Sequence, residues 1–212
     1  MFDEKFTPRP KVPGEQADKR WGGYNLEFKL ASKELWDELQ GNIERLRMQS
    51  ITVSGERQAQ RKFRIEISKY EYCQDREERE VDDFVTCQVY TPSLLVAEKL
   101  RSICQQMREY EHRVHPVPRS RDFYDLHALL TEGGVELSES GVDDVIRSVF
   151  EAKRAPLRLL ACVPSYREFH EDDWDSVVNT IPAGRSRDYG FYFEFVVAEL
   201  RKLQHLWVED PP

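Results

Sequence analysis

The hydrophobic positions in the first half of the chain follow a period of two. Every second residue is apolar in three short segments, which is typical of β-strands with one apolar and one polar face. The segments with this pattern are residues 24–30, 61–70 and 84–90. We therefore expect a β-sheet in the N-terminal half, with Phe63, Ile65 and Ile67 pointing inward from its second strand.

The rest of the chain has apolar residues at helical spacing. Positions three and four residues apart share one face of an α-helix, so this spacing predicts helices that pack on a core. The expected helices are 33–48, 92–109, 120–130, 139–153, 156–162, 165–180 and 191–207. Ser32 is the expected N-cap of the first, and Pro92 lies in the first turn of the second. Strands that come early and helices that come late predict an α+β fold.

Composition divides the chain into three regions. Residues 1–20 hold three prolines and few apolar side chains, so we expect an extended or flexible arm there. Residues 21–90 form the expected sheet region, in which the charged segment 74–83 is predicted to be a solvated turn. Residues 91–212 form the expected helical region.

Charge and cysteine content narrow the class of protein. A formal net charge of −8 argues against nucleic-acid binding over a whole surface, but it leaves room for a local basic cleft. No apolar run approaches the ~18 residues of a membrane span, and the first residues do not resemble a signal peptide. The four cysteines are scattered without a C-x-x-C pair, which favours free thiols in a cytoplasmic protein over a zinc site.

One lysine lies at the border of the apolar stripe on the helix expected over 92–109. At 100° per residue, Lys99 falls beside Val96 and Leu100. A lysine in this place can lay its stem along the core and hold its ammonium over a cleft. It can equally be an edge lysine paired with a carboxylate, and spacing alone does not separate these two interpretations.

The helix expected over 120–130 opens with charged residues. Asp122 lies at the border of its apolar face, and Asp125 follows one turn on, with Arg121 as its i,i+4 partner. Acidic residues in a first turn complement the helix dipole without any chemistry. An Arg-Asp-x-x-Asp run that begins after an irregular segment, with Arg119 beside it, is also a common way to present charges at the mouth of a cleft.

Carboxylates on the polar faces of the strands are candidates for metal chemistry. Glu66 is one, because Mg²⁺ is held by one or two carboxylates together with substrate phosphates. Glu27-Phe-Lys29 also satisfies the E-x-K signature of metal-dependent nucleases, with Asp18 as the upstream acid. For both, the alternative is the solvent face of an antiparallel sheet.

Two motifs in tandem connect these segments to a known family. The first is Tyr90-Thr-Pro-x-x-x-x-Ala97-Glu-Lys99-Leu-Arg101, and the second is Arg121-Asp122-x-Tyr-Asp125-Leu. With the strands at 22–30 and 63–67 and the helical tail, they resemble the AbiEii/AbiGii family of nucleotidyltransferase toxins over roughly residues 20–205. The resemblance implies a polymerase-β-like nucleotidyltransferase core, in which a mixed β-sheet precedes a helical C-terminal half.

The resemblance also implies an activity. Members act as toxins of two-gene toxin–antitoxin or phage abortive-infection systems, and some transfer nucleotides from an NTP to the 3′ ends of tRNA. The implied roles are triphosphate contact for Lys99, catalysis for Lys99, Asp122 and Asp125, substrate binding for Arg119 and Arg121, and metal binding for Glu66. The implied cofactor is Mg²⁺, the implied substrate is an NTP, and the implied partners are RNA and a cognate antitoxin protein, without a membrane.

The sequence departs from the pattern of that family at one place. Members carry a Gly-Gly-Ser/Thr loop and an Asp-x-Asp pair ahead of the first aligned strand, and the sequence in hand has neither. The leading hypothesis is therefore a nucleotidyltransferase-like toxin with little or no transferase activity, because half of its metal site is missing. The alternatives are a non-catalytic module that binds nucleotide, RNA or protein, and a metal-dependent nuclease that uses Glu27 and Lys29.

Overall fold

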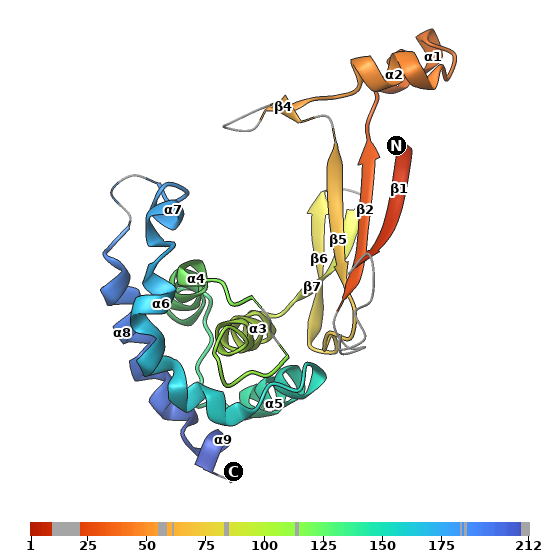
Figure 1. Cartoon of the computed structure of the whole chain (residues 1–212). Coiled ribbons are helices and arrows are strands. Elements are labelled where there is room, and N and C mark those ends of the chain that lie inside the picture. Colours follow the sequence, from red (N-terminus) through yellow and green to blue (C-terminus); the bar gives the residue numbers. More distant parts are fainter. Residues whose placement is uncertain are drawn as a thin grey trace. The chain divides into compact units, whose positions relative to one another are not determined.

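The structure is a computed structural model that describes residues 1–9, 22–54, 59–60, 62–82, 85–112, 115–182, 184 and 186–208. The chain divides into two compact units, Met1–Tyr70 and Glu71–Pro212, which we call unit 1 and unit 2 and describe separately (Figure 1). Small antiparallel sheets lie in the N-terminal half, and the helices lie mainly in the C-terminal half. The predicted α+β fold class is thus confirmed.

Unit 1 contains a three-stranded antiparallel sheet. Its strands, in spatial order, are β1 (Phe2–Arg9), β2 (Gly23–Lys29) and β5 (Phe63–Ser68). Leu26 pairs with Ile65 and Phe28 with Phe63, so the apolar residues of the period-two pattern share one face. Ile65 and Ile67 nevertheless stay exposed, against the expectation that they point into a core.

The first residues of the chain form a strand, where an arm was expected. β1 pairs antiparallel with β2, with Phe6 opposite Leu26 and Pro8 opposite Tyr24. The arm was predicted from the prolines, and for residues 2–9 this prediction was wrong. Proline is tolerated on an edge strand, and β1 lies at the edge of this sheet. Residues 10–20 of the expected arm lie outside the described part of the chain.

Two short helices stand where one was expected. α1 (Lys33–Glu38) and α2 (Ile43–Gln49) are separated at Gln40 and Gly41, whose φ angles of 49° and 72° are left-handed. Left-handed residues end an α-helix, which explains the break. Ser32 caps α1 as predicted, with its side chain accepting a backbone N–H from the first turn.

The core of unit 1 is small. Phe2, Leu39 and Leu46 are buried together, so β1 is tied to the two helices. The other strands among the described residues of the unit are β3 (Val53–Ser54) and β4 (Ala59–Gln60), which pair antiparallel with each other.

Unit 2 begins with a two-stranded ribbon. Residues 74–83 were expected to be a turn, but β6 (Arg76–Asp82) pairs antiparallel with β7 (Val85–Tyr90). Antiparallel strands can face water, so the many charged side chains of β6 do not prevent pairing. Gln88 Nε2 donates to Glu78 Oε2 at 3.2 Å across the ribbon. The described strands thus form small antiparallel sheets, where the family resemblance implied one mixed sheet.

The rest of unit 2 is helical, and α3 lies at its centre. Its helices are α3 (Pro92–Cys104), α4 (Ser120–Thr131), α5 (Val142–Ala152), η1 (Leu157–Tyr166), α6 (Arg167–Glu171), α7 (Trp174–Val178), α8 (Tyr189–Leu200), η2 (Arg201–Leu203) and α9 (His205–Val208). α3 packs between α4 and α5, and α4 also packs against α7 and α8 (Figure 1). The side chains of Leu94, Ile103, Phe123 and Ile146 have no exposed surface at this centre.

Several predicted helices of unit 2 have different ends. The helix expected over 92–109 ends at Cys104, and the one expected over 165–180 is split between Glu171 and Trp174 into α6 and α7. The last one begins at Tyr189 and gives way to η2 after Leu200. Helical spacing of apolar residues thus located these elements, but it did not fix where the helical hydrogen bonds stop.

The pairing of β2 with β5 gives a testable prediction at Gly23. A Cβ at this position would lie 1.9 Å from the backbone oxygen of Ile67, so the two strands would have to separate. We expect Gly23→Ala to cost about 2 kcal/mol of stability, within the usual range for destabilising substitutions, and to speed amide exchange along β5. Hydrogen exchange measured by mass spectrometry checks this. Asn25→Ala on the same strand is the control, and equal exchange in both variants would contradict the register.

Candidate functional site

The candidate site is built on α3 and α4 of unit 2. Thr91 caps α3, because its Oγ1 accepts the Leu94 N–H at 3.2 Å, and Pro92 follows at the first helical position as predicted. Val96 and Leu100 are buried, which places Lys99 at the border of the apolar face. The ammonium of Lys99 is therefore held at the edge of the core.

α4 is anchored by its apolar face. Phe123 and Leu126 are fully buried, and Phe123 packs against the rings of Tyr189 and Phe193 from α8. With these residues inside, Asp122 lies at the border of the core and is nearly buried. Buried apolar residues on both helices thus set the positions of the charged ones.

The charged residues of the two helices meet at Lys99. Its Nζ lies 3.1 Å from Asp122 Oδ1 and 2.6 Å from Asp125 Oδ2. Arg121 Nε donates to the other oxygen of Asp125 at 2.9 Å, and Arg119 Nε lies 3.9 Å from Asp122 Oδ2. We call these five residues the Lys99 cluster. The structure therefore brings together all the site residues that the sequence suggested on α3 and α4.

The cluster has an excess of positive charge. It holds three cations and two carboxylates, and the side chains of Arg119 and Arg121 are 39% and 49% exposed. Burial alone would lower the pKa of Lys99, but the carboxylates of Asp122 and Asp125 outweigh it and raise that pKa. Lys99 is therefore a cation at any physiological pH, and the cluster suits an anionic ligand.

The lysine is not saturated by its two carboxylates. An ammonium has three N–H donors, of which Asp122 and Asp125 use two. Arg121 has five donors, of which one goes to Asp125 and one to the hydroxyl of Thr180 at 2.6 Å. The remaining donors can bind phosphate oxygens, for which arginine forks and lysine charges are the usual partners.

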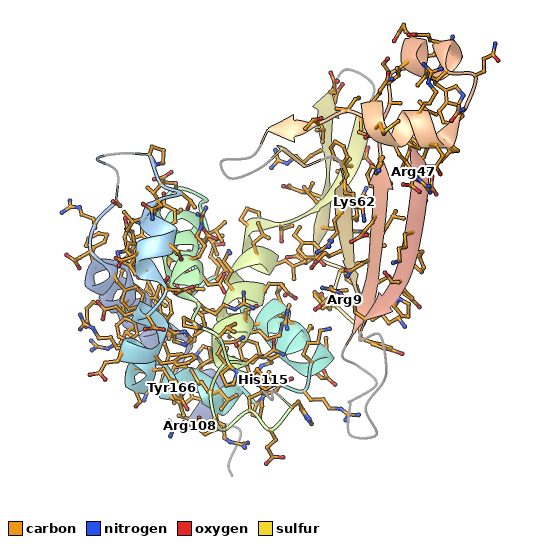
Figure 2. The ribbon with its side chains drawn as sticks, turned by 45° about the horizontal axis from the view of Figure 1, so that its top comes forward. Arg9, Arg47, Lys62, Arg108, His115 and Tyr166 are labelled. Carbon is orange, nitrogen blue, oxygen red and sulfur yellow. The ribbon has the colours of Figure 1, made fainter. Side chains whose placement is uncertain are left out.

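Glu66 and the E-x-K pair lie in unit 1, on the strands predicted for them. The Glu66 carboxylate is 2.8 Å from NH1 of Arg9, which is labelled in Figure 2. Glu27 accepts from Arg64 at 2.8 Å and from Lys62, and the former contact contributes most to lowering the pKa of Glu27. Each carboxylate is thus neutralised by basic neighbours, and Lys29 lies 3.6 Å from Asp3. Among the described residues of unit 1, which do not include Asp18, no contact specifically favours the nuclease hypothesis.

The Lys99 cluster does not fit a divalent metal. Mg²⁺ needs carboxylate oxygens that are available to it, but both acids of the cluster bind the Lys99 ammonium. The second oxygen of Asp122 has no hydrogen-bond partner among the described residues, but it is buried and lies 3.9 Å from Arg119 Nε. Within the described ranges, no three or more His, Cys, Asp or Glu side chains gather as metal ligands would. We therefore derive no chemical step through a metal at this cluster.

Sequence reasoning missed three polar residues around the cluster. Asp173 Oδ1 accepts from the backbone N–H of Ser120 at 3.1 Å and from its hydroxyl at 2.6 Å. Thr180 accepts from Arg121, as described above. Asp173 lies 53 residues after Ser120 and Thr180 lies 59 residues after Arg121, and no local pattern in the sequence signals such contacts.

The fold and the cluster define an α+β protein with a group of three cations and two carboxylates at the edge of its helical core. A family model for the AbiEii nucleotidyl transferase toxin of type IV toxin–antitoxin systems matches residues 17–198, and the chain belongs to this family. The predicted family is therefore confirmed. The comparisons found no matching curated protein and no matching solved structure. Among the described residues, no helix is both long and apolar enough to cross a membrane.

Proposed function

We propose that the Lys99 cluster binds the triphosphate of an NTP, and that it serves the transfer of a nucleotide to RNA, with tRNA as the first acceptor to test. The observation that carries the proposal is the ammonium of Lys99, fixed between α3 and α4 by two carboxylates with one donor to spare. Membership of a nucleotidyl transferase family supports the choice of ligand. The cognate antitoxin is the partner that a type IV system implies.

The acidic and basic side chains of the cluster have different roles in binding. Asp122 and Asp125 orient the lysine and keep it charged, while Lys99 and Arg121 present donors to the phosphate oxygens. The guanidinium of Arg121 also lies 5.4 Å from the ring centroid of Tyr124, which limits its motion. Binding of this kind positions a triphosphate and offsets its charge, which is most of what phosphoryl and nucleotidyl transfer require of a protein.

The same geometry argues for impaired turnover by this chain. Nucleotidyl transfer generally needs carboxylates that hold metal ions, and the acids of the cluster are committed to Lys99. We infer that the chain binds NTP and transfers nucleotides slowly or not at all on its own. A non-catalytic nucleotide-binding module is the second candidate, and this commitment of Asp122 and Asp125 is the observation that favours it.

Binding and transfer can be measured separately on the purified chain. We expect calorimetry to show binding of at least one of the four NTPs, and weaker binding of the matching monophosphate. Incubation with α-labelled NTP, Mg²⁺ and tRNA is expected to give little or no labelled RNA. Failure of all four NTPs to bind at millimolar concentration would remove the proposal. Rapid labelling of tRNA would support nucleotidyl transfer to RNA and contradict the inference that this chain transfers nucleotides slowly or not at all.

A further inference from the structure

The segment Asp173–Thr180, which contains α7, touches the first turn of α4 at two points. At the first point, Asp173 accepts from both the backbone N–H and the hydroxyl of Ser120, which is fully buried. The N-cap residue of α4 is Arg119, and in the described structure its side chain makes no capping hydrogen bond. Asp173 therefore caps α4 from another element, and its negative charge favours the positive end of that helix.

The second point of contact is the hydroxyl of Thr180. This hydroxyl donates to the Val177 carbonyl oxygen at 2.7 Å and accepts from Arg121 Nη1 at 2.6 Å. Its proton is thus committed to the backbone, so its lone pair faces the guanidinium. Trp174 and Val177 are nearly buried and anchor the segment on the core.

These contacts continue without a break to the lysine. Thr180 binds Arg121, whose Nε binds one oxygen of Asp125 at 2.9 Å, and the other oxygen of Asp125 binds Lys99 at 2.6 Å. Arg121 thus contacts Thr180 and Asp125, and Asp125 contacts Arg121 and Lys99. A change at Thr180 is therefore passed to Lys99 through two ion-paired side chains.

We propose that Asp173 and Thr180 are positioning residues for the Lys99 cluster, and that the segment between them determines how tightly this cluster binds a triphosphate. The proposal rests on the proposed function for its ligand, but not for its geometry. Asp173 fixes where α4 begins, and so fixes the direction of Asp122 and Asp125. Thr180 fixes Arg121, and so fixes which oxygen of Asp125 is left for Lys99.

Matched substitutions separate positioning from mere stability. Thr180→Val keeps the size and branching of the side chain but removes the acceptor, while Thr180→Ser keeps the hydroxyl. Asp173→Ala removes the cap, while Asp173→Asn keeps a carbonyl oxygen for Ser120. We expect Thr180→Val and Asp173→Ala to weaken NTP binding about tenfold, as loss of a hydrogen bond to a charged group does, and the conservative variants to stay near the wild type.

A second measurement does not depend on the nucleotide. NMR of lysine labelled with ¹⁵N follows the exchange of ammonium protons with water, and the Lys99 signal is assigned by its loss in Lys99→Arg. We expect exchange to be faster in Thr180→Val than in Thr180→Ser, because Asp125 is then held less firmly. If Asp173→Ala does not fold, the Thr180 pair decides the question.

The outcomes have separate meanings. The proposal is supported if the Lys99 ammonium protons exchange more slowly in the wild type than in Thr180→Val, and if Thr180→Val also binds NTP more weakly. A lower melting temperature with unchanged binding and unchanged Lys99 exchange would show a purely structural role and overturn it. Equal effects of Val and Ser at position 180 would also overturn it, because the hydroxyl would not matter. If the wild-type chain binds no NTP, the proposed function fails while Lys99 exchange still tests the positioning.

Discussion

Lys99→Met is expected to lose NTP binding by about 10- to 100-fold, which is the effect of removing a charged donor from a phosphate. The same change leaves Asp122 and Asp125 without the ammonium that both contact. Breaking a fully buried ion pair costs about 3–5 kcal/mol. The Lys99 side chain is 22% exposed, so we expect about 2 kcal/mol here, after solvent screening. Calorimetry with NTP and urea denaturation measure the two effects.

The chain offers a close control for this variant. Lys202 also contacts two carboxylates, Glu136 at 2.8 Å and Glu199 at 3.0 Å, at a more exposed place in unit 2. Lys202→Met likewise removes a lysine that contacts two carboxylates, so at this more exposed place we expect a small loss of stability and unchanged NTP binding. If Lys99→Met binds NTP as well as Lys202→Met does, the cluster is not the nucleotide site.

The position of Lys99 could be predicted because it depends on local periodicity. Once Val96 and Leu100 are placed in a core, the geometry of an α-helix leaves Lys99 at its border. The same argument on α4 places Asp122 at the border of the core beside the buried Phe123. The two borders face each other because α3 packs on α4. The family resemblance supported this packing, but the periodicity of either helix could not predict it.

Other features depend on partners that are distant in the chain. The cap of α4 comes from Asp173, and the support of Arg121 comes from Thr180, each more than fifty residues away. β6 was missed for a related reason, because its charged residues do not alternate with apolar ones and its pairing with β7 is what makes it a strand. Apolar periodicity in a sequence predicts which residues are buried. These features are instead held by hydrogen bonds between polar groups, which that periodicity does not predict.

Arg101 shows the limit of a linear motif. It lies only two residues after Lys99 in the motif that connects the chain to its family, but two residues on a helix differ by 200°. Its side chain is 6% exposed and points into unit 2, where it contacts Glu98, Glu71 at 3.4 Å and Gln105 at 2.7 Å. Arg101 is therefore part of a buried ion cluster and does not join the Lys99 cluster.

The buried cluster around Arg101 is balanced in charge. Lys153, which is also buried, lies 2.9 Å from the other oxygen of Glu71, so two cations face two carboxylates. Burial raises the pKa of Glu98, and the guanidinium of Arg101 opposes that rise. One oxygen of Glu98 has no hydrogen-bond partner among the described residues. Arg101 is thus the group that most strongly opposes the rise in the pKa of Glu98.

Arg101→Leu is expected to destabilise unit 2 by about 3–5 kcal/mol at pH 8, because it leaves Glu98 without the cation it contacts and Glu71 with Lys153 alone. The loss should shrink as the pH falls. Without Arg101 the pKa of Glu98 rises further above its usual value of 4.5, so between these two values the folded state binds a proton that the unfolded state does not. Stability therefore increases as pH falls through that window. Urea denaturation of the variant and wild type between pH 5 and 8 measures the difference.

Glu98→Gln tests whether the loss of stability in Arg101→Leu comes from the charge of Glu98. In the double variant with Arg101→Leu, the charge that Arg101 neutralised is gone, so we expect part of the lost stability to return at pH 8 and most of the pH dependence to disappear. A cost that is the same at every pH, or that Glu98→Gln does not reduce, would place the effect in packing of the arginine stem and not in its charge. The two variants together thus decide whether α3, which carries Lys99 on one side, is held on its other side by an ion cluster or by apolar contact alone.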